Sequence, residues 1–283
     1  MVYRRSTLRS SSYRARRRTV RSARRSPYTA KTRRYRRTTT RPRRRMMPKR
    51  KLLDVTSTKK RDTLGYYDPA ATTSRGLTFT GGPIGEIKSF IFSPTARNST
   101  STTETTDRNA STVFWKGVSE TVSITANSQV PWRWRRIVFE TKGLRVADSF
   151  LETSSGYTRV CSAFSDAATM SRLFKGTRDV DWFSAMDAQI YNNRARVIYD
   201  KLRVMRSAAG PHFHTYKDYI KLEKNMHYDE DENGGTITTS PWSTDGRSGM
   251  GDIYIFDLFE CITGGTSHEI TIRPQATVYW HEK

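Results

Sequence analysis

The stretch Gly251-Asp-Ile-Tyr-Ile-Phe-Asp-Leu-Phe-Glu-Cys-Ile262 decides the fold class of this 283-residue chain. Apolar side chains occupy nearly every position on both faces of the extended run, which is typical of a strand that is buried on both sides. The earlier stretch Val118–Ala126 instead alternates between apolar or acidic residues and small hydroxyl residues. Such alternation predicts a strand with one buried face. Both patterns indicate a β protein.

Runs of the same kind recur along the chain and are separated by turn residues. Glycine, often next to proline, serine or asparagine, marks the connections at residues 81–83, 154–156, 233–235 and 264–265. Helical patterns are few, and Val180–Ile190 is the best candidate for a short helix within a loop. The predicted strands are Leu77–Thr80, Ile87–Phe92, Val118–Ala126, Trp132–Thr141, Tyr157–Phe164, Ala195–Met205, Gly251–Ile262 and Glu269–Trp280.

About eight strands joined by long polar loops favour two packed antiparallel sheets. We therefore predict an all-β fold, with an eight-stranded jelly roll as the leading architecture and a disordered basic arm before it. An immunoglobulin-like sandwich is the alternative. The length of the connections and the lack of a Cys…Trp…Cys pattern disfavour it.

The positive charge of the chain is concentrated at one end. The net charge is +23, and residues 1–61 alone contribute +24, with 25 Lys and Arg against a single acid, Asp54. The remaining 222 residues have 25 basic and 26 acidic side chains. Because like charges repel and apolar residues are scarce, residues 1–61 are expected to be disordered alone. The sequence thus predicts a basic arm, 1–61, and a folded body, 62–283.

The arm is richer in arginine than in lysine, 20 to 5. Guanidinium groups fork onto phosphate oxygens and stack on bases, so nucleic acid is the expected partner. Since no recognition helix is evident, binding should be insensitive to sequence and steeply weakened by salt. The predicted binding residues of the arm are Arg14, Arg16, Arg17, Arg18, Arg33, Arg34, Tyr35, Arg36, Arg37, Arg41, Arg43, Arg44, Arg45, Lys49, Arg50 and Lys51.

The last basic cluster of the arm also has the composition of a nuclear localisation signal. A nuclear import receptor is therefore a second expected partner. The apolar residues Leu52, Leu53 and Val55 follow this cluster and are expected to dock on the folded body, as a hinge. The residues of the predicted signal are Arg41, Arg43, Arg44, Arg45, Lys49, Arg50 and Lys51.

A second nucleic-acid hypothesis concerns the run Trp132, Arg133, Trp134, Arg135 and Arg136. In a strand, both tryptophans lie on one face, and Arg133 and Arg135 lie on the other. On an exposed face the indoles would stack on unpaired bases while Arg136 holds a phosphate. The alternative is that both tryptophans are core or subunit-contact residues, with the arginines at an interface.

No pattern of metal-ligating or catalytic residues stands out. His212 and His214 share one strand face, which supplies at most half a metal site. The acidic run Asp229–Glu232 lacks the ligand spacing of a calcium loop. We expect it to be an exposed hairpin tip or to pair with basic residues of a neighbouring subunit. No metal, cofactor or enzyme activity is expected.

The two cysteines and the hydropathy exclude other classes of protein. Cys161 and Cys261 lie a hundred residues apart, so neither a disulfide framework nor a thiolate zinc site is expected. No apolar run approaches the roughly 18 residues that a membrane span needs, and no membrane partner is expected.

A set of stretches spread over most of the chain carries a family resemblance. They are Lys49–Thr63, Pro131–Ile137 with Phe139 and Lys142-Gly143, Tyr199–Arg203, Tyr228–Glu232, Pro241-Trp242, Gly249–Tyr254 and Ala276–Lys283. In this order they resemble the capsid proteins of genomoviruses. The resemblance implies a viral jelly-roll subunit of a small icosahedral shell around circular single-stranded DNA. It implies no enzyme activity, since replication in that family belongs to a separate protein.

The same resemblance implies localisation to the virion and, during assembly, to the host nucleus. In the simplest icosahedral case the chain's main partner is itself, in about 60 copies. About 60 arms of this charge would carry about 1,400 positive charges, enough to offset a DNA strand of similar nucleotide count. The alternative is a cellular, non-enzymatic nucleic-acid-binding protein with a basic tail, which would stay monomeric.

Overall fold

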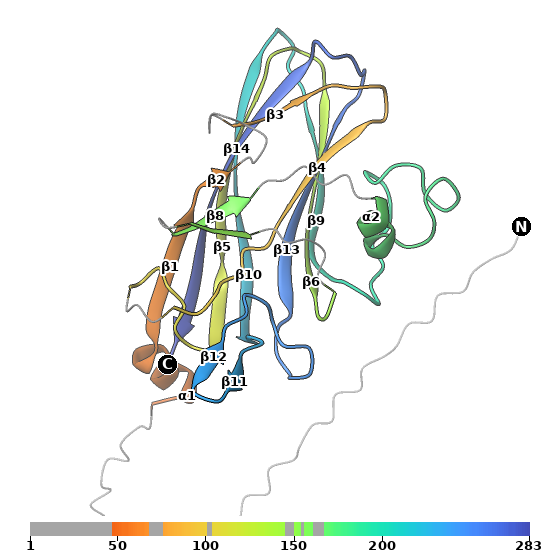
Figure 1. Cartoon of the computed structure of the whole chain (residues 1–283). Helices are drawn as coiled ribbons and strands as arrows, with labels where there is room; N and C mark the ends of the chain where they lie inside the picture. Colours follow the sequence, from red (N-terminus) through yellow and green to blue (C-terminus); the bar gives the residue numbers. More distant parts are fainter. Residues whose placement is uncertain (1–46, 68–75, 101–103, 145–149, 154–155, 161–166) are drawn as a thin grey trace, which may run out of the picture. The chain divides into compact units, whose positions relative to one another are not determined.

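The computed structural model describes residues 47–67, 76–100, 104–144, 150–153, 156–160 and 167–283. Residues 47–283 form one compact unit in which two antiparallel sheets pack face to face (Figure 1). The prediction of an all-β fold with two packed antiparallel sheets is confirmed at this level.

The first sheet has the strand order β1-β14-β5-β10, and β3 pairs with β14 next to β1. The second sheet has the order β4-β13-β6-β9. The strands of the first sheet are β1 (Thr58–Leu64), β3 (Leu77–Thr80), β5 (Thr112–Ala126), β10 (His212–His227) and β14 (Glu269–Glu282). Those of the second are β4 (Ile87–Phe92), β6 (Trp132–Thr141), β9 (Arg196–Met205) and β13 (Asp252–Cys261).

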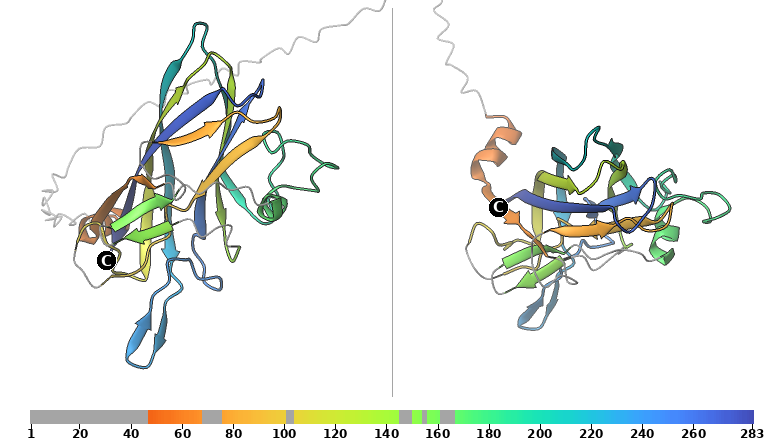
Figure 2. Two further views of the ribbon diagram at one scale, coloured as in Figure 1. Left: turned by 45° about the horizontal axis from the view of Figure 1, so that its top comes forward. Right: turned by 90° about the horizontal axis from the view of Figure 1, so that it is seen from above.

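Smaller elements lie around the two sheets. A hairpin of β11 and β12 projects from the body, and β2, β8 and β7 form a small separate sheet (Figure 2). No helix in the described part of the chain is long and apolar enough to cross a membrane. The bounds are α1 (Lys49–Thr56), β2 (Tyr66–Tyr67), β7 (Phe150–Thr153), β8 (Gly156–Val160), α2 (Ala167–Leu173), β11 (Asp231–Asn233) and β12 (Thr236–Thr238).

Strand β13 is buried along its whole length, as its sequence predicts. One face packs between the sheets in clusters that contain Ile253, Ile255 and Phe259. The other face packs against residues that follow α2, including Trp182 and Met186. The second sheet is therefore covered on its outer side by its own chain (Figure 1).

The helix predicted over Val180–Ile190 is wrong. This segment runs through turns, and isolated bridges join Arg178 to Trp182 and Phe174 to Ile190. Its buried apolar side chains cover the second sheet, so tertiary packing outweighs the local helical pattern. Val180 and Phe183 remain 75% and 78% exposed.

The body begins earlier than the predicted boundary between residues 61 and 62, which falls inside β1. This strand pairs with β14 along its whole length, from Thr58 opposite Glu282 to Leu64 opposite Ala276. Lys60 is buried because an ion pair with Glu282, at 3.2 Å, compensates its charge. The four residues at 58–61 therefore belong to the body despite their basic character.

Candidate nucleic-acid interface

The predicted binding residues from Arg14 to Arg45 lie outside the described residues. Lys49, Arg50 and Lys51 form the first turn of α1, which begins directly after Pro48. The apolar residues of this helix do not dock on the body as predicted, since Leu52, Leu53 and Val55 are 51%, 46% and 68% exposed. The described part of the predicted localisation signal thus lies on a short helix at the surface.

The two tryptophans predicted to stack on bases lie inside the body. Trp132 and Trp134 are 1% and 0% exposed and belong to the cluster packed between the sheets. The ring of Trp134 stacks on Phe259 at 5.8 Å, and its indole N–H donates to Asp257 at 2.8 Å. The DNA-stacking hypothesis is wrong for both residues, because no base reaches a side chain enclosed by two sheets. They are core residues, the alternative that the sequence left open.

The three arginines of this run are held by acidic residues of the same chain. Arg133, the most exposed of them, pairs with Asp187 at 2.6 Å and with Glu260 at 3.2 Å. Arg135 forms two hydrogen bonds with Asp200, at 3.0 and 2.6 Å. Two backbone carbonyls of the loop after α2, at residues 185 and 188, also accept from Arg135. Arg133 and Arg135 therefore fix two segments to β6. One is the loop between α2 and β9, residues 174–195, which we call the covering loop, and the other is strand β9.

Arg136 is fully buried and cannot hold an external phosphate as predicted. Its guanidinium group lies 2.6 Å from Glu120, 2.7 Å from Asp257 and 3.5 Å from Asp218. Asp218 also lies 3.0 Å from Arg203. These five residues, which we call the charged layer, come from β5, β6, β9, β10 and β13. They occur at the same level of both sheets, since Glu120 is opposite Asp218 and Arg136 is opposite Asp257.

The charged layer separates two apolar parts of the interior. On β5, Glu120 lies between Val118 and Val122, which belong to different hydrophobic clusters. On β13, Asp257 likewise lies between Ile255 and Phe259. Buried charges are tolerated only when partners compensate them, so the layer requires all its strands in register.

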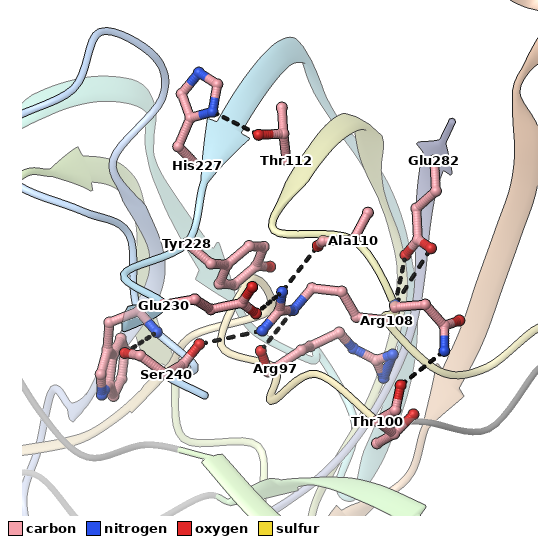
Figure 3. A network of polar contacts seen from close by, with 12 residues as sticks. Arg97, Thr100, Arg108, Ala110, Thr112, His227, Tyr228, Glu230, Ser240 and Glu282 are labelled. Carbon is pink, nitrogen blue, oxygen red and sulfur yellow. Dashed lines mark hydrogen bonds and ion pairs between the residues drawn. The ribbon is translucent and has the colours of Figure 1, made fainter. Parts of the chain in front are cut away.

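A second buried network fixes the end of the body where β1 begins (Figure 3). Arg108 is 0% exposed, lies 2.5 Å from Glu230, and donates to the carbonyls of Arg97 and Ala110 at 3.0 and 2.8 Å. Its guanidinium group also lies 3.7 Å from the ring centroid of Tyr228. The network therefore ties the loop between β4 and β5, which contains Arg97 and Arg108, to Tyr228 and Glu230, which directly precede β11.

The same network reaches β1 and β14. Arg97 pairs with Asp62 of β1, and Glu282 of β14 accepts from the backbone N–H of Asn109 at 3.3 Å. Burial raises the pKa of Asp62 above its usual value, although the neighbouring Arg97 opposes this shift. Strand β1 and the end of β14 are thus held by buried polar contacts to the loop between β4 and β5.

The acidic run Asp229–Glu232 is divided between two environments. Glu230 is engaged with Arg108, whereas Asp231 and Glu232 are exposed on the β11–β12 hairpin. This agrees with the predicted exposed hairpin. In the described part of the chain, no three His, Cys, Asp or Glu side chains are grouped so as to hold a metal ion.

The outer face of the first sheet is a basic surface that the sequence reasoning missed. Its centre, on β5, consists of small residues such as Ser119 and Thr121, and basic residues surround it on β1, β5, β10 and β14. On β10 the exposed residues lie at the odd positions from 213 to 221, and the spacing of Lys217 and Lys221 along this face was the signal available from the sequence. The basic residues of this face are Lys59, Arg61, Lys116, Lys217, Lys221 and Arg273.

Comparison with known proteins leaves the family open. No protein-family model matches this chain, and no curated protein matches it.

Proposed function

We propose that this chain is a viral capsid protein whose copies assemble into a small icosahedral shell and package circular single-stranded DNA. The observation that carries the proposal is the partition of charge. Residues 1–46 contain 19 Arg and Lys and no Asp or Glu, and they precede a folded two-sheet body. A polycation joined to a compact body suits a protein that folds by itself and condenses a polyanion.

The order of the main strands supports a jelly-roll architecture. The eight strands β3, β4, β5, β6, β9, β10, β13 and β14, counted in chain order, are divided between the two sheets in the orders 1-8-3-6 and 2-7-4-5. Strand 1 then pairs with 8, 2 with 7, 3 with 6 and 4 with 5, as in an antiparallel ribbon rolled into two sheets. Viral capsid domains are among the proteins built on this plan.

Exposed apolar side chains support contacts between subunits. Leu202 and Val204, on the edge strand β9, are 43% and 57% exposed, and Phe183 in the covering loop is 78% exposed. An edge strand presents unpaired backbone groups that pair readily with another chain. Among the described strands β9 has β6 as its one neighbour, and this edge with its apolar side chains favours a protein that associates with copies of itself.

The positions of the basic groups support two further roles in the proposal, which are nuclear import and DNA binding. The predicted nuclear localisation signal includes Lys49 and Lys51, which are exposed on α1. An import receptor would reach them before assembly in a host nucleus. The Arg-rich residues 1–46 would then be available to bind DNA during assembly.

The direct test is electron microscopy of the purified full-length protein mixed with circular single-stranded DNA. Uniform closed particles are expected, because the body supplies subunit contacts and the arm offsets the DNA charge. Monomers at both low and moderate salt would contradict the capsid assignment. They would favour a cellular nucleic-acid-binding protein instead.

A further inference from the structure

A shallow pocket of about 520 Å³ lies on the outer face of the first sheet. It is lined by Lys59 and Arg61 of β1, Lys116 of β5, Tyr219 of β10, and Tyr279 and His281 of β14. No Asp or Glu is among its lining residues in the described part of the chain. The pocket therefore combines cationic side chains with aromatic rings on an exposed surface.

The strand register brings these residues together. Arg61 is opposite Tyr279, which is opposite Gly117, and Tyr219 is opposite Ser119. The two tyrosines thus come from the strands on either side of β5, and the β5 residues between them are small. Because neighbouring strands are about 4.8 Å apart, these two strands are about 10 Å apart. This arrangement leaves a depression between two aromatic side chains.

Glycine at position 117 is required for this shape. A Cβ atom at this position would lie 2.7 Å from the hydroxyl oxygen of Tyr219 and 2.6 Å from the carbonyl oxygen of Ile220. Both distances are shorter than a normal van der Waals contact. The ring of Tyr219 therefore lies over the β5 backbone, where only glycine leaves room, and is 55% exposed to solvent.

The positive charge of the pocket is only partly compensated. Lys59 pairs with Asp54 at 3.3 Å, but both side chains are more than half exposed, so this ion pair is weak. Lys116 and Lys221 share Glu223, at 2.8 and 2.9 Å. Hydrogen bonds from these two lysines lower the pKa of Glu223 to about 2, so its carboxylate is ionised at neutral pH.

The guanidinium group of Arg61 is suited to bind an external anion. Arg61 is exposed at the rim of the pocket, and its planar guanidinium group matches a phosphate in two-point geometry. Exposed tyrosine rings stack on bases only where the bases are not paired in a duplex. The chemistry of the pocket thus fits a phosphodiester group with an unpaired base beside it.

We propose that this pocket binds a nucleotide unit of single-stranded DNA, with the phosphate on Arg61 and Lys116 and the base stacked on Tyr219 or Tyr279. The identity of the strand as DNA rests on the proposed function. The site is separate from residues 1–46 and lies on the folded body. The body would then guide the packaged strand along the first sheet while residues 1–46 neutralise its charge.

The test is photo-cross-linking of the full-length protein to a thymine strand that contains 5-iododeoxyuridine, followed by mass spectrometry of the peptides. Adducts are expected on Tyr219 or Tyr279 as well as on arm peptides. Excess unlabelled single-stranded DNA should abolish the pocket adducts, and the same sequence as a duplex should not. A duplex that competes equally well would overturn the stacking role.

Three variants separate the pocket from the arm. R61Q with K116Q should lower the adduct yield on Tyr219 and Tyr279 by about tenfold, because the phosphate loses two charge-assisted contacts while the tyrosines that accept the cross-link remain. K217Q is the matched control, since Lys217 is a basic residue of the same sheet face outside the pocket and its loss should change the yield little. E223Q should raise the yield by a few fold, because Lys116 and Lys221 lose their carboxylate partner.

The outcomes distinguish this proposal from the proposed function. Adducts confined to arm peptides, in a protein that still forms closed particles with DNA, would overturn the pocket and leave the capsid assignment intact. Failure of the full-length protein to bind DNA at all would instead overturn the proposed function. A wild-type adduct on either tyrosine that falls in R61Q with K116Q, but not in K217Q, would support the pocket.

Discussion

Replacing Arg136 by methionine is expected to lower the free energy of unfolding of the body by about 3–5 kcal/mol. Arg136 is fully buried and within 3.5 Å of three carboxylates, those of Glu120, Asp218 and Asp257. Its removal leaves these groups with Arg203 as the remaining cation of the charged layer. Uncompensated buried charge is among the most destabilising changes a core can receive. Urea unfolding followed by tryptophan fluorescence measures the loss.

Two further variants identify the cause of that loss. R133M removes an arginine from the same strand whose side chain is 23% exposed, and it should cost less than about 1 kcal/mol. Adding E120Q to R136M should recover part of the stability, because it removes one of the buried negative charges that Arg136 compensates in the wild type. Equal losses in R136M and R133M, or a further loss on adding E120Q, would contradict the role assigned to the charged layer.

Deleting residues 1–46 is expected to lower the affinity for single-stranded DNA by about a thousandfold or more at 0.15 M salt. This deletion removes 19 basic residues and no acid. If about ten of them contact phosphates, the slope of log K against log salt should fall by about 7 in magnitude. Fluorescence anisotropy with a labelled strand at several salt concentrations measures both quantities.

The structure determines where this deletion should end. Removal of residues 1–61 would also take away α1 and the first half of β1, which pairs with β14. A loss of DNA binding would then have two possible causes, the removal of positive charge and the damage to the sheet. A full-length variant with every Arg and Lys of residues 1–46 changed to Gln is the matched control and should bind as weakly as the deletion. Unchanged affinity in both proteins would contradict the packaging role.

The strands were predictable wherever a segment kept a single hydropathy pattern along its whole length. Leu77–Thr80, Ile87–Phe92 and Trp132–Thr141 were predicted with the bounds that the structure has. Part of Tyr157–Phe164 lies outside the described residues. Strand β10, the longest of the described strands, was missed because its inner face mixes Asp218 and Tyr216 with aliphatic residues, and this mixture hides the alternation. That mixture exists because the charged layer interrupts the core.

The candidate site was harder to predict, because burial depends on partners far away in the sequence. The run of tryptophan and arginine at 132–136 is the same in sequence whether its arginines face solvent or buried acids. Only the register of β6 against β13, more than a hundred residues later, decides between these cases. The pocket on the first sheet likewise needs residues from β1, β5, β10 and β14, and no local pattern unites them.

The charged layer also has a consequence for synthesis on the ribosome. Glu120 and Arg136 are made early, whereas Asp257, the main partner of Arg136, follows 121 residues later. At about 5–20 residues per second, this delay lasts about 6–24 s. During that interval the growing chain holds an arginine and a glutamate that no completed interior encloses. The finished sandwich therefore forms only when nearly the whole chain has been translated, so nascent copies have no mature surface with which to associate.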